Sequence, residues 1–160
     1  MSAATITTVT LEQFNALRPQ MRHLDRDVLE AVGCDPEKEL DDSWAAATTR
    51  KLIIDETTQQ PLGIWLSMHP YMDDKTSLWT LLTFNALDKE VVAFVRNTRK
   101  VIPMLFEFEP AYVTRAISVM PLAFERSLAW HLRVIKSKII FNFDFKAQPH
   151  VMVEMRKEWY

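Results

Sequence analysis

His131 and Arg133 are the two polar residues of this sequence whose types and spacing best fit a chemical role. An imidazole exchanges a proton near neutral pH, so His131 could act as a general acid or base. The alternative interpretation is an exposed or hydrogen-bonded structural pair at a contact surface. The residues alone therefore indicate a candidate site and assign no catalytic residue.

Metal, hydrolase and thiol chemistry find little support among the remaining residues. The four histidines show neither H-x-x-x-H nor carboxylate-paired spacing, so no metal site is predicted; they are His23, His69, His131 and His150. No serine stands in a G-x-S-x-G turn, which argues against a serine hydrolase. Cys34, the only cysteine, excludes an internal disulfide and favours a reducing compartment. It follows Gly33 at an expected helix end, where an inert thiol is expected.

The charge of the chain limits its partners. A net charge of −2 excludes an obvious polyanion-binding protein, and no basic groove surrounds the tryptophans, so no specific nucleic-acid binding is predicted. Residues 1–87 hold 13 acidic and 7 basic side chains, whereas residues 88–160 hold 8 acidic and 12 basic ones. This asymmetry can orient association with a partner, and two solvated faces are the alternative. No apolar run approaches the roughly 20 residues that span a bilayer, so no membrane span is expected.

A helix that leads directly into a strand positions the candidate pair. Within residues 121–138, apolar side chains recur at steps of four, four and three, which is typical of one helix face; they are Phe124, Leu128, Leu132 and Ile135. Within residues 139–146 the period changes to two, which predicts a half-buried strand with one apolar face; its members are Ile139, Phe141, Phe143 and Phe145. The sequence therefore predicts a helix laid against the sheet that it enters.

The rest of the chain supplies the other elements of one domain, residues 1–160. Strands are expected within residues 5–10, 51–56, 62–68, 78–84, 112–120 and 151–155. Helices are expected from residue 10 to 33 with a break at Pro19, and from Asp88 to Pro103, which ends or kinks the helix. The acidic segment at residues 35–42 is either a loop or a helix start, with one further apolar edge up to residue 47. The final Trp159 and Tyr160 could either anchor a partner or cap the last strand. This order predicts an α/β fold: a mixed, mostly antiparallel twisted sheet with helices on both faces.

Four short segments carry a resemblance to known proteins. They are Asp27-Val28-Leu29-Glu30-Ala31 with Gly33 behind it, Pro61-Leu62-Gly63-Ile64, Trp79-Thr80-Leu81-Leu82-Thr83, and His131-Leu132-Arg133-Val134-Ile135-Lys136 followed by Phe141. Their order and spacing resemble the GNAT-like internal virion proteins of short-tailed phages, over about residues 20–145. The predicted order of elements is also that of the GNAT acyltransferase fold. The resemblance implies a single GNAT-like domain.

The resemblance also implies where a cofactor would bind. In active GNAT enzymes a glycine-containing turn after the central strand presents backbone N–H groups to the diphosphate of acetyl-CoA. The matching turn, residues 84–89, has no glycine, and Asp88 places a negative charge there. A tyrosine that often protonates the leaving thiolate has no counterpart in residues 121–138. The candidate cofactor-binding residues are therefore only Thr83, Asn85, Ala86, His131 and Arg133.

These departures favour a non-catalytic function. The first hypothesis is a GNAT-like virion component that acts in head assembly or DNA ejection, with other phage virion proteins as partners and no cofactor. Its expected location is the virion interior, and the host cytoplasm during assembly. One alternative is an acyl-CoA-dependent N-acetyltransferase with a degenerate cofactor turn, which would use acetyl-CoA. Another is a phage protein that binds a host factor.

Overall fold

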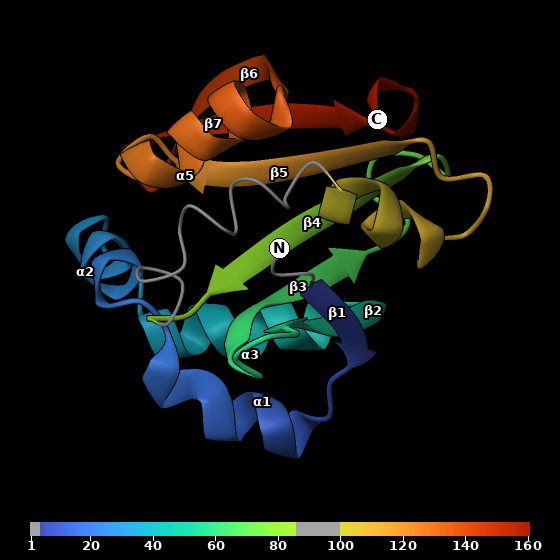
Figure 1. Ribbon diagram of the computed structural model, residues 1–160. Coiled ribbons are helices and arrows are strands. Elements are labelled where there is room, and N and C mark those ends of the chain that lie inside the picture. The colour runs from blue at the N-terminus through green and yellow to red at the C-terminus, as the bar shows by residue number, and fades with distance from the viewer. Residues whose placement is uncertain (1–3, 86–99) are drawn as a thin grey trace.

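The described residues form one seven-stranded sheet (Figure 1). The computed structural model describes residues 4–85 and 100–160. The strands are β1 (Ala4–Thr8), β2 (Thr49–Asp55), β3 (Pro61–Met68), β4 (Thr76–Thr83), β5 (Arg115–Pro121), β6 (Lys138–Phe145) and β7 (Gln148–Arg156). Their order across the sheet is β1-β2-β3-β4-β5-β7-β6. Only β4 and β5 are parallel; all the other neighbouring pairs are antiparallel, as the sequence predicts.

Short helices connect these strands. They are α1 (Leu11–Leu17), the 3-10 turn η1 (Arg18–Gln20), α2 (His23–Ala31), α3 (Pro36–Ala46), α5 (Glu125–Trp130), the π-helical segment η2 (His131–Ile135) and the final 3-10 turn η3 (Lys157–Trp159). Residues 100–107 are also helical. Capping explains where the first helices begin: the Thr10 side chain accepts from the Gln13 N–H, and the Asp35 carboxylate accepts from the Glu37 N–H. Gly33, with φ of +78°, follows α2 as expected.

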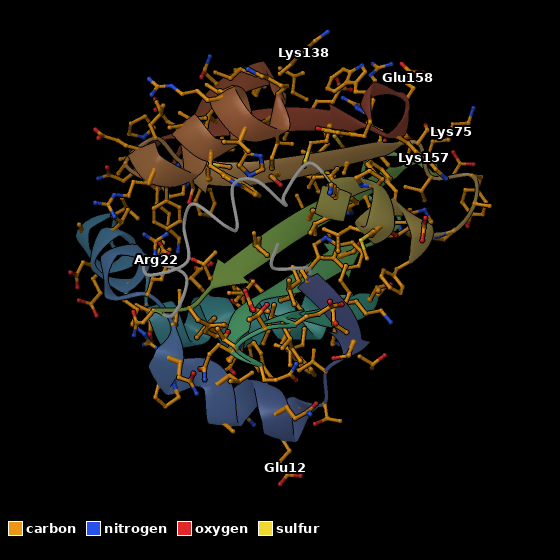
Figure 2. The ribbon with its side chains drawn as sticks, in the orientation of Figure 1. Glu12, Arg22, Lys75, Lys138, Lys157 and Glu158 are labelled. Atoms are coloured by element: carbon orange, nitrogen blue, oxygen red, sulfur yellow. The ribbon has the colours of Figure 1, made fainter. Side chains whose placement is uncertain are left out.

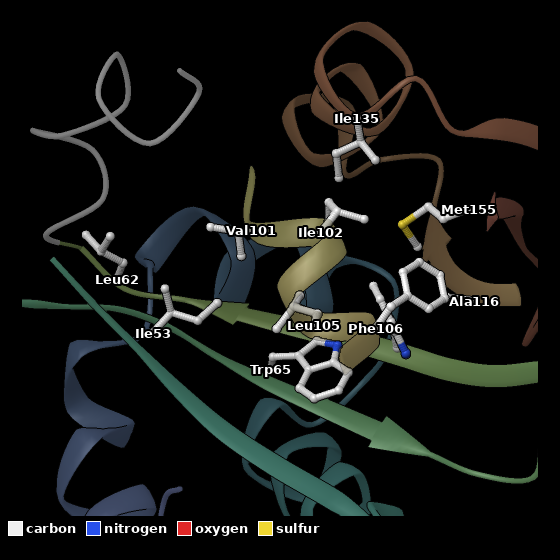
Figure 3. Packing of buried hydrophobic residues seen from close by; sticks show 11 residues of the cluster. Ile53, Leu62, Trp65, Val101, Ile102, Leu105, Phe106, Ala116, Ile135 and Met155 are labelled. Atoms are coloured by element: carbon white, nitrogen blue, oxygen red, sulfur yellow. The ribbon is translucent and has the colours of Figure 1, made fainter. Parts of the chain in front are cut away.

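The helices cover both faces of the sheet. On one face, Phe14 of α1 and Leu40 of α3 pack on apolar residues of β2 and β3. On the other, the helix over residues 100–107 packs on the central strands together with Ile135 of η2; Figure 3 shows Ile102 lying between this helix and Ile135. α5 lies on this second face too, because Leu128 packs with Val151 and Val153 of β7. The predicted fold class is therefore confirmed.

Gly63 allows the two central strands to approach each other closely. A Cβ at this position would lie 2.8 Å from the carbonyl oxygen of Leu82 on β4, well inside van der Waals contact. Any other residue would push β3 and β4 apart. One of the two glycines of the chain therefore serves the packing of the sheet.

Two expectations from the sequence are wrong in detail. Pro103 does not end its helix, which continues to residue 107; the expected start at Asp88 lies outside the described residues. The strand predicted to be half-buried, β6, is exposed along almost its whole length because it forms the outer edge of the sheet. A bulge between Ile139 and Phe141 also interrupts its alternation, so Ile139 does not share a face with the three phenylalanines.

Glu109 joins the segment after the helix over residues 100–107 to the central strands. Its buried carboxylate accepts hydrogen bonds from the Ser67 hydroxyl on β3 and from the Trp79 indole N–H, 2.7 Å away, on β4. Both donors are themselves buried. Since an unpaired buried donor costs free energy, this carboxylate fixes the helix and the two strands relative to one another.

We expect Glu109→Ala to lower the free energy of unfolding by about 3 kcal/mol, because it leaves two buried donors without an acceptor. Glu109→Gln is the matched control, since its amide oxygen still accepts from one or both donors, and we expect it to cost less than about 1 kcal/mol. Urea unfolding followed by tryptophan fluorescence measures both. Equal losses in the two variants would contradict the role given to this acceptor.

Candidate functional site

The sheet opens where β4 and β5 separate (Figure 1). The two strands pair over only three residue pairs, from Thr76 opposite Arg115 to Leu78 opposite Ile117. Beyond this point each strand continues for several residues without pairing to the other. The last link is a hydrogen bond of 3.0 Å from the Ser118 hydroxyl to the Trp79 carbonyl. The two strands therefore diverge beyond Leu78 and Ile117.

The backbone of Leu81 faces this gap. Peptide groups of successive strand residues point to opposite sides of the strand. The Trp79 carbonyl is directed to β5, where Ser118 donates to it, and the Phe84 N–H is directed to Leu62 of β3. The N–H and C=O of Leu81 must therefore point toward β5, which has already separated. Within the described part of the chain, no strand residue pairs with them there.

A small cavity of about 30 Å³ lies over the point of separation. Its wall includes Leu81 from β4, Ser118 from β5, and Trp130 and His131 from α5 and η2. The rest of the wall is apolar except for the indole of Trp79 and that of Trp65. This volume is close to the space that one water molecule occupies in the liquid. An acyl group would therefore have to displace part of the wall in order to enter.

His131 is buried in this wall, with 7% of its surface exposed. Desolvation by burial lowers the pKa of its imidazole to about 4, so the ring is neutral at pH 7. Its Nδ1 lies 3.3 Å from the Ser137 hydroxyl, and its ring meets that of Trp130 edge-on at a centroid separation of 5.0 Å. A neutral imidazole held by these neighbours can exchange a hydrogen bond but is a weak base at neutral pH.

The structure does not bring Arg133 together with His131. Both residues belong to η2, but Arg133 is exposed whereas His131 is buried. The end of η2 is fixed by the Tyr160 hydroxyl, which donates to the Ile135 carbonyl at 2.9 Å. The sequence left two roles open for Trp159 and Tyr160, an anchor for a partner or a cap on the last strand. This contact within the fold favours a structural role for Tyr160. The His131–Arg133 pair is therefore not a single site.

The end of β4 is closed by the first helices. The Thr83 hydroxyl donates to the Asp25 carboxylate at 2.8 Å, and the Thr83 carbonyl accepts from the backbone N–H of Arg22 at 3.2 Å; Figure 2 shows Arg22 between α2 and this end of the sheet. The Asn85 N–H donates to the Gln20 carbonyl at 2.8 Å. That donor is therefore engaged, and the Asp25 carboxylate is bonded to Thr83, two residues before it. Ala86 lies outside the described residues.

Sequence reasoning missed Ser118, the Leu81 peptide and Asp25. Ser118 carried a signal, since it is the one polar residue on the inward side of an otherwise apolar strand. The Leu81 peptide carried none, because strand separation depends on tertiary packing. Asp25 lies in a helix with several other charged residues, so nothing in the sequence distinguished it from them.

No three His, Cys, Asp or Glu side chains of the described residues gather into a metal site. No helix among these residues is both long enough and apolar enough to cross a membrane.

Comparisons with solved structures identify the architecture. An acetyltransferase of the GNAT family from Bacillus anthracis superposes with a TM-score of 0.66 at 11% identity, covering 99% of each chain. An aminoglycoside acetyltransferase in complex with coenzyme A gives a TM-score of 0.69 at 14% identity, covering 98% of this chain and 96% of its own. Spermidine N-acetyltransferase from Vibrio cholerae, in complex with coenzyme A and spermine, gives a TM-score of 0.65 at 8% identity, covering 97% of this chain and 96% of its own.

These likenesses concern the whole fold and not the sequence. No protein-family model matches the chain, and no curated protein matches it. At identities between 8% and 14%, a superposition over nearly the whole of both chains demonstrates a shared fold and leaves the activity open. The chain has the fold of the GNAT acetyltransferases.

Proposed function

We propose that the protein binds an acyl-CoA thioester between β4 and β5 and transfers its acyl group to an amine. The observation that carries this proposal is the early separation of the two parallel strands, which leaves the Leu81 peptide facing an open gap. A ligand with amide groups can complete the interrupted strand by pairing with a peptide of this kind. The solved neighbours that contain coenzyme A share this fold, which supports the same ligand class.

The described residues fit the acyl-pantetheine end of such a ligand. The pantetheine arm contains two amides, and the Leu81 N–H and C=O offer one donor and one acceptor at the gap. The cavity over the gap is mostly apolar, which suits an acyl chain. The diphosphate end would lie near residues 84–89. Of these, Asn85 has its N–H bonded to Gln20.

The residues of this chain would mainly orient the ligand and exclude water. Coenzyme A supplies an acyl group that is activated as a thioester. The Leu81 peptide would align the arm, and Ser118 would hold the two strands at the point of separation. Trp130 and the neutral His131 would cover the reacting end. Because a base with a pKa of about 4 takes protons poorly at pH 7, His131 is assigned no proton transfer from the amine.

The charge of the first half of the chain favours a cationic acceptor. Residues 1–87 carry an excess of acidic over basic side chains, and Asp25 stands at the end of β4 beside the gap. A primary amine is protonated at neutral pH and is attracted by such a surface. The acceptor we propose is therefore an amine-bearing molecule with net positive charge.

The closed end of β4 favours a second candidate, a non-catalytic component of a phage virion. The engaged Asn85 N–H and the neighbouring Asp25 carboxylate both disfavour a bound diphosphate. In this proposal the protein acts in head assembly or DNA ejection inside the virion and contacts other virion proteins. A contact with a host factor is a variant of the same idea. The resemblance described from the sequence is its support.

Calorimetric titration with acetyl-CoA decides between the two proposals. If the acyltransferase proposal is correct, we expect a dissociation constant in the micromolar range, with hydrolysis-resistant acetyl-CoA analogues binding similarly. Absence of binding at about 1 mM ligand would reject it and leave the virion proposal, which detection of the protein in purified phage particles then tests.

We expect Ser118→Phe to weaken acetyl-CoA binding at least about tenfold, because the phenyl group occupies the cavity at the point of separation. Val119→Phe is the matched control: it adds a similar ring to the next residue of β5, on the opposite and exposed face. Thermal unfolding of both variants establishes that they fold. A folded Ser118→Phe protein that binds as tightly as the control would contradict this placement of the ligand.

The buried His131 should make stability fall in mild acid. Its pKa is about 4 in the folded protein, against 6.5 for the unperturbed side chain. The unfolded chain therefore takes up a proton first as the pH falls from 6.5 to 4, and the folded state loses stability. Between pH 7 and pH 5 we expect the wild type to lose about 2 kcal/mol more than His131→Gln, as measured by urea unfolding. Parallel pH profiles for the two proteins would contradict the assigned pKa.

A further inference from the structure

β6 leaves both a backbone edge and an apolar face exposed. It is the last strand of the sheet, and among residues 4–85 and 100–160 it pairs only with β7. Phe141 exposes 59% of its surface and Phe145 49%, although both are large apolar side chains. Neither belongs to the buried clusters formed by the described residues. Exposed aromatic groups beside a free strand edge are typical of a surface that meets another chain.

The three phenylalanines of β6 share one face with residues of its neighbours. Phe141 lies opposite Met152 and Phe143 opposite His150, so these side chains project to the same side. The ring of His150 contacts those of Phe143 and Phe145, each at 5.6 Å between centroids. We call Phe141, Phe143, Phe145, His150 and Met152 the phenylalanine face. α5 packs on the other side of the sheet, against Val151 and Val153.

The tight turn between β6 and β7 determines which backbone groups of β6 face outward. Lys146 and Ala147 form a two-residue turn with positive φ at both positions, and Phe145 and Gln148 flank it. In such a hairpin the flanking residues exchange hydrogen bonds with each other. The peptides of residues 141, 143 and 145 therefore bond to β7. Those of Asn142 and Asp144 point to the free edge.

We propose that a second copy of this chain pairs with β6 across a twofold axis at Phe143, joining the two sheets into one. Antiparallel pairing then sets Asn142 of one protomer opposite Asp144 of its partner, and their outward N–H and C=O groups exchange hydrogen bonds. Phe143 meets its own copy on the axis, and each Phe141 lies opposite a Phe145. All three cross-strand pairs on the phenylalanine face are aromatic.

The edge is complementary to itself in this arrangement. On the opposite face, the Asn142 amide can donate to the Asp144 carboxylate of the other protomer, so no like charges meet within residues 141–145. Moving the axis to Asn142 would pair Phe141 with Phe143 and leave Phe145 opposite the bulged segment at residues 139–141. The bulge therefore limits the pairing to the five regular residues. Lys138, before the bulge, places its ammonium group over the ring of Trp159, 4.7 Å from the ring centroid.

The area available indicates a dimer of moderate affinity. At roughly 200 Å² for an aromatic side chain, the exposed parts of Phe141 and Phe145 amount to about 200 Å² in each protomer. A standard interface buries about 800 Å² per partner, and the strand edge adds only part of the difference. We therefore expect a dissociation constant in the micromolar range.

Sedimentation equilibrium over increasing protein concentration tests the pairing. We expect a monomer–dimer equilibrium, weakened at least about tenfold in Asn142→Pro, which removes an outward N–H and leaves the bonds to β7 intact. Leu122→Asn, which changes an exposed side chain outside the phenylalanine face, is the control and should dimerise normally. A wild type that stays monomeric at about 1 mM would overturn the proposal.

Disulfide trapping tests the axis. In a Cys34→Ser background, Phe143→Cys places two thiols in a non-hydrogen-bonded pair, where Cα atoms lie about 4.5 Å apart, within reach of a disulfide. We expect rapid crosslinking of this variant under mild oxidation. Asn142→Cys is the matched control, because its thiols would be offset by two residues along the strands, and it should crosslink slowly. Faster crosslinking through residue 142 would reject the proposed axis.

Discussion

The structure depends on how briefly β4 and β5 are paired. Three residue pairs and the Ser118–Trp79 hydrogen bond join a four-stranded half of the sheet to a three-stranded half. The helix over residues 100–107 packs across this junction, and Glu109 ties its end to β3 and β4. Because the helix and the carboxylate hold the halves together from one side, the strands themselves are free to separate at the other end.

Much of this architecture can be predicted from the sequence, because local interactions determine it. Thr10 and Asp35 begin helices by capping their first N–H groups, and Gly33 follows a helix in a conformation that suits glycine. The strands alternate with a period of two, and the order of the elements limits the possible sheets. The class of fold and the central position of β4 follow from these patterns and agree with the structure.

The candidate site was harder to predict, because it depends on which surfaces meet. The alternating phenylalanines of β6 indicate a strand, but a period of two describes the pleat and not what covers each face. In the same way, the spacing of His131 and Arg133 along one helical segment does not reveal that the first is buried and the second exposed. Ser118 shows the reverse case: a single hydroxyl in an apolar strand was visible in the sequence, but its partner is a backbone carbonyl on a distant strand.

The bulge in β6 assigns neighbouring apolar residues to different surroundings. Ile139 lies opposite Val153 on the side of the sheet covered by α5, whereas Phe141 lies opposite Met152 on the uncovered side. Because one extra residue produces this change, no exchange of side chains can reproduce it. A regular ladder that kept every residue would instead place Ile139 and Phe141, which are two apart, on a common side. The location of the bulge, and not only the composition of the strand, therefore decides which apolar side chains stay uncovered.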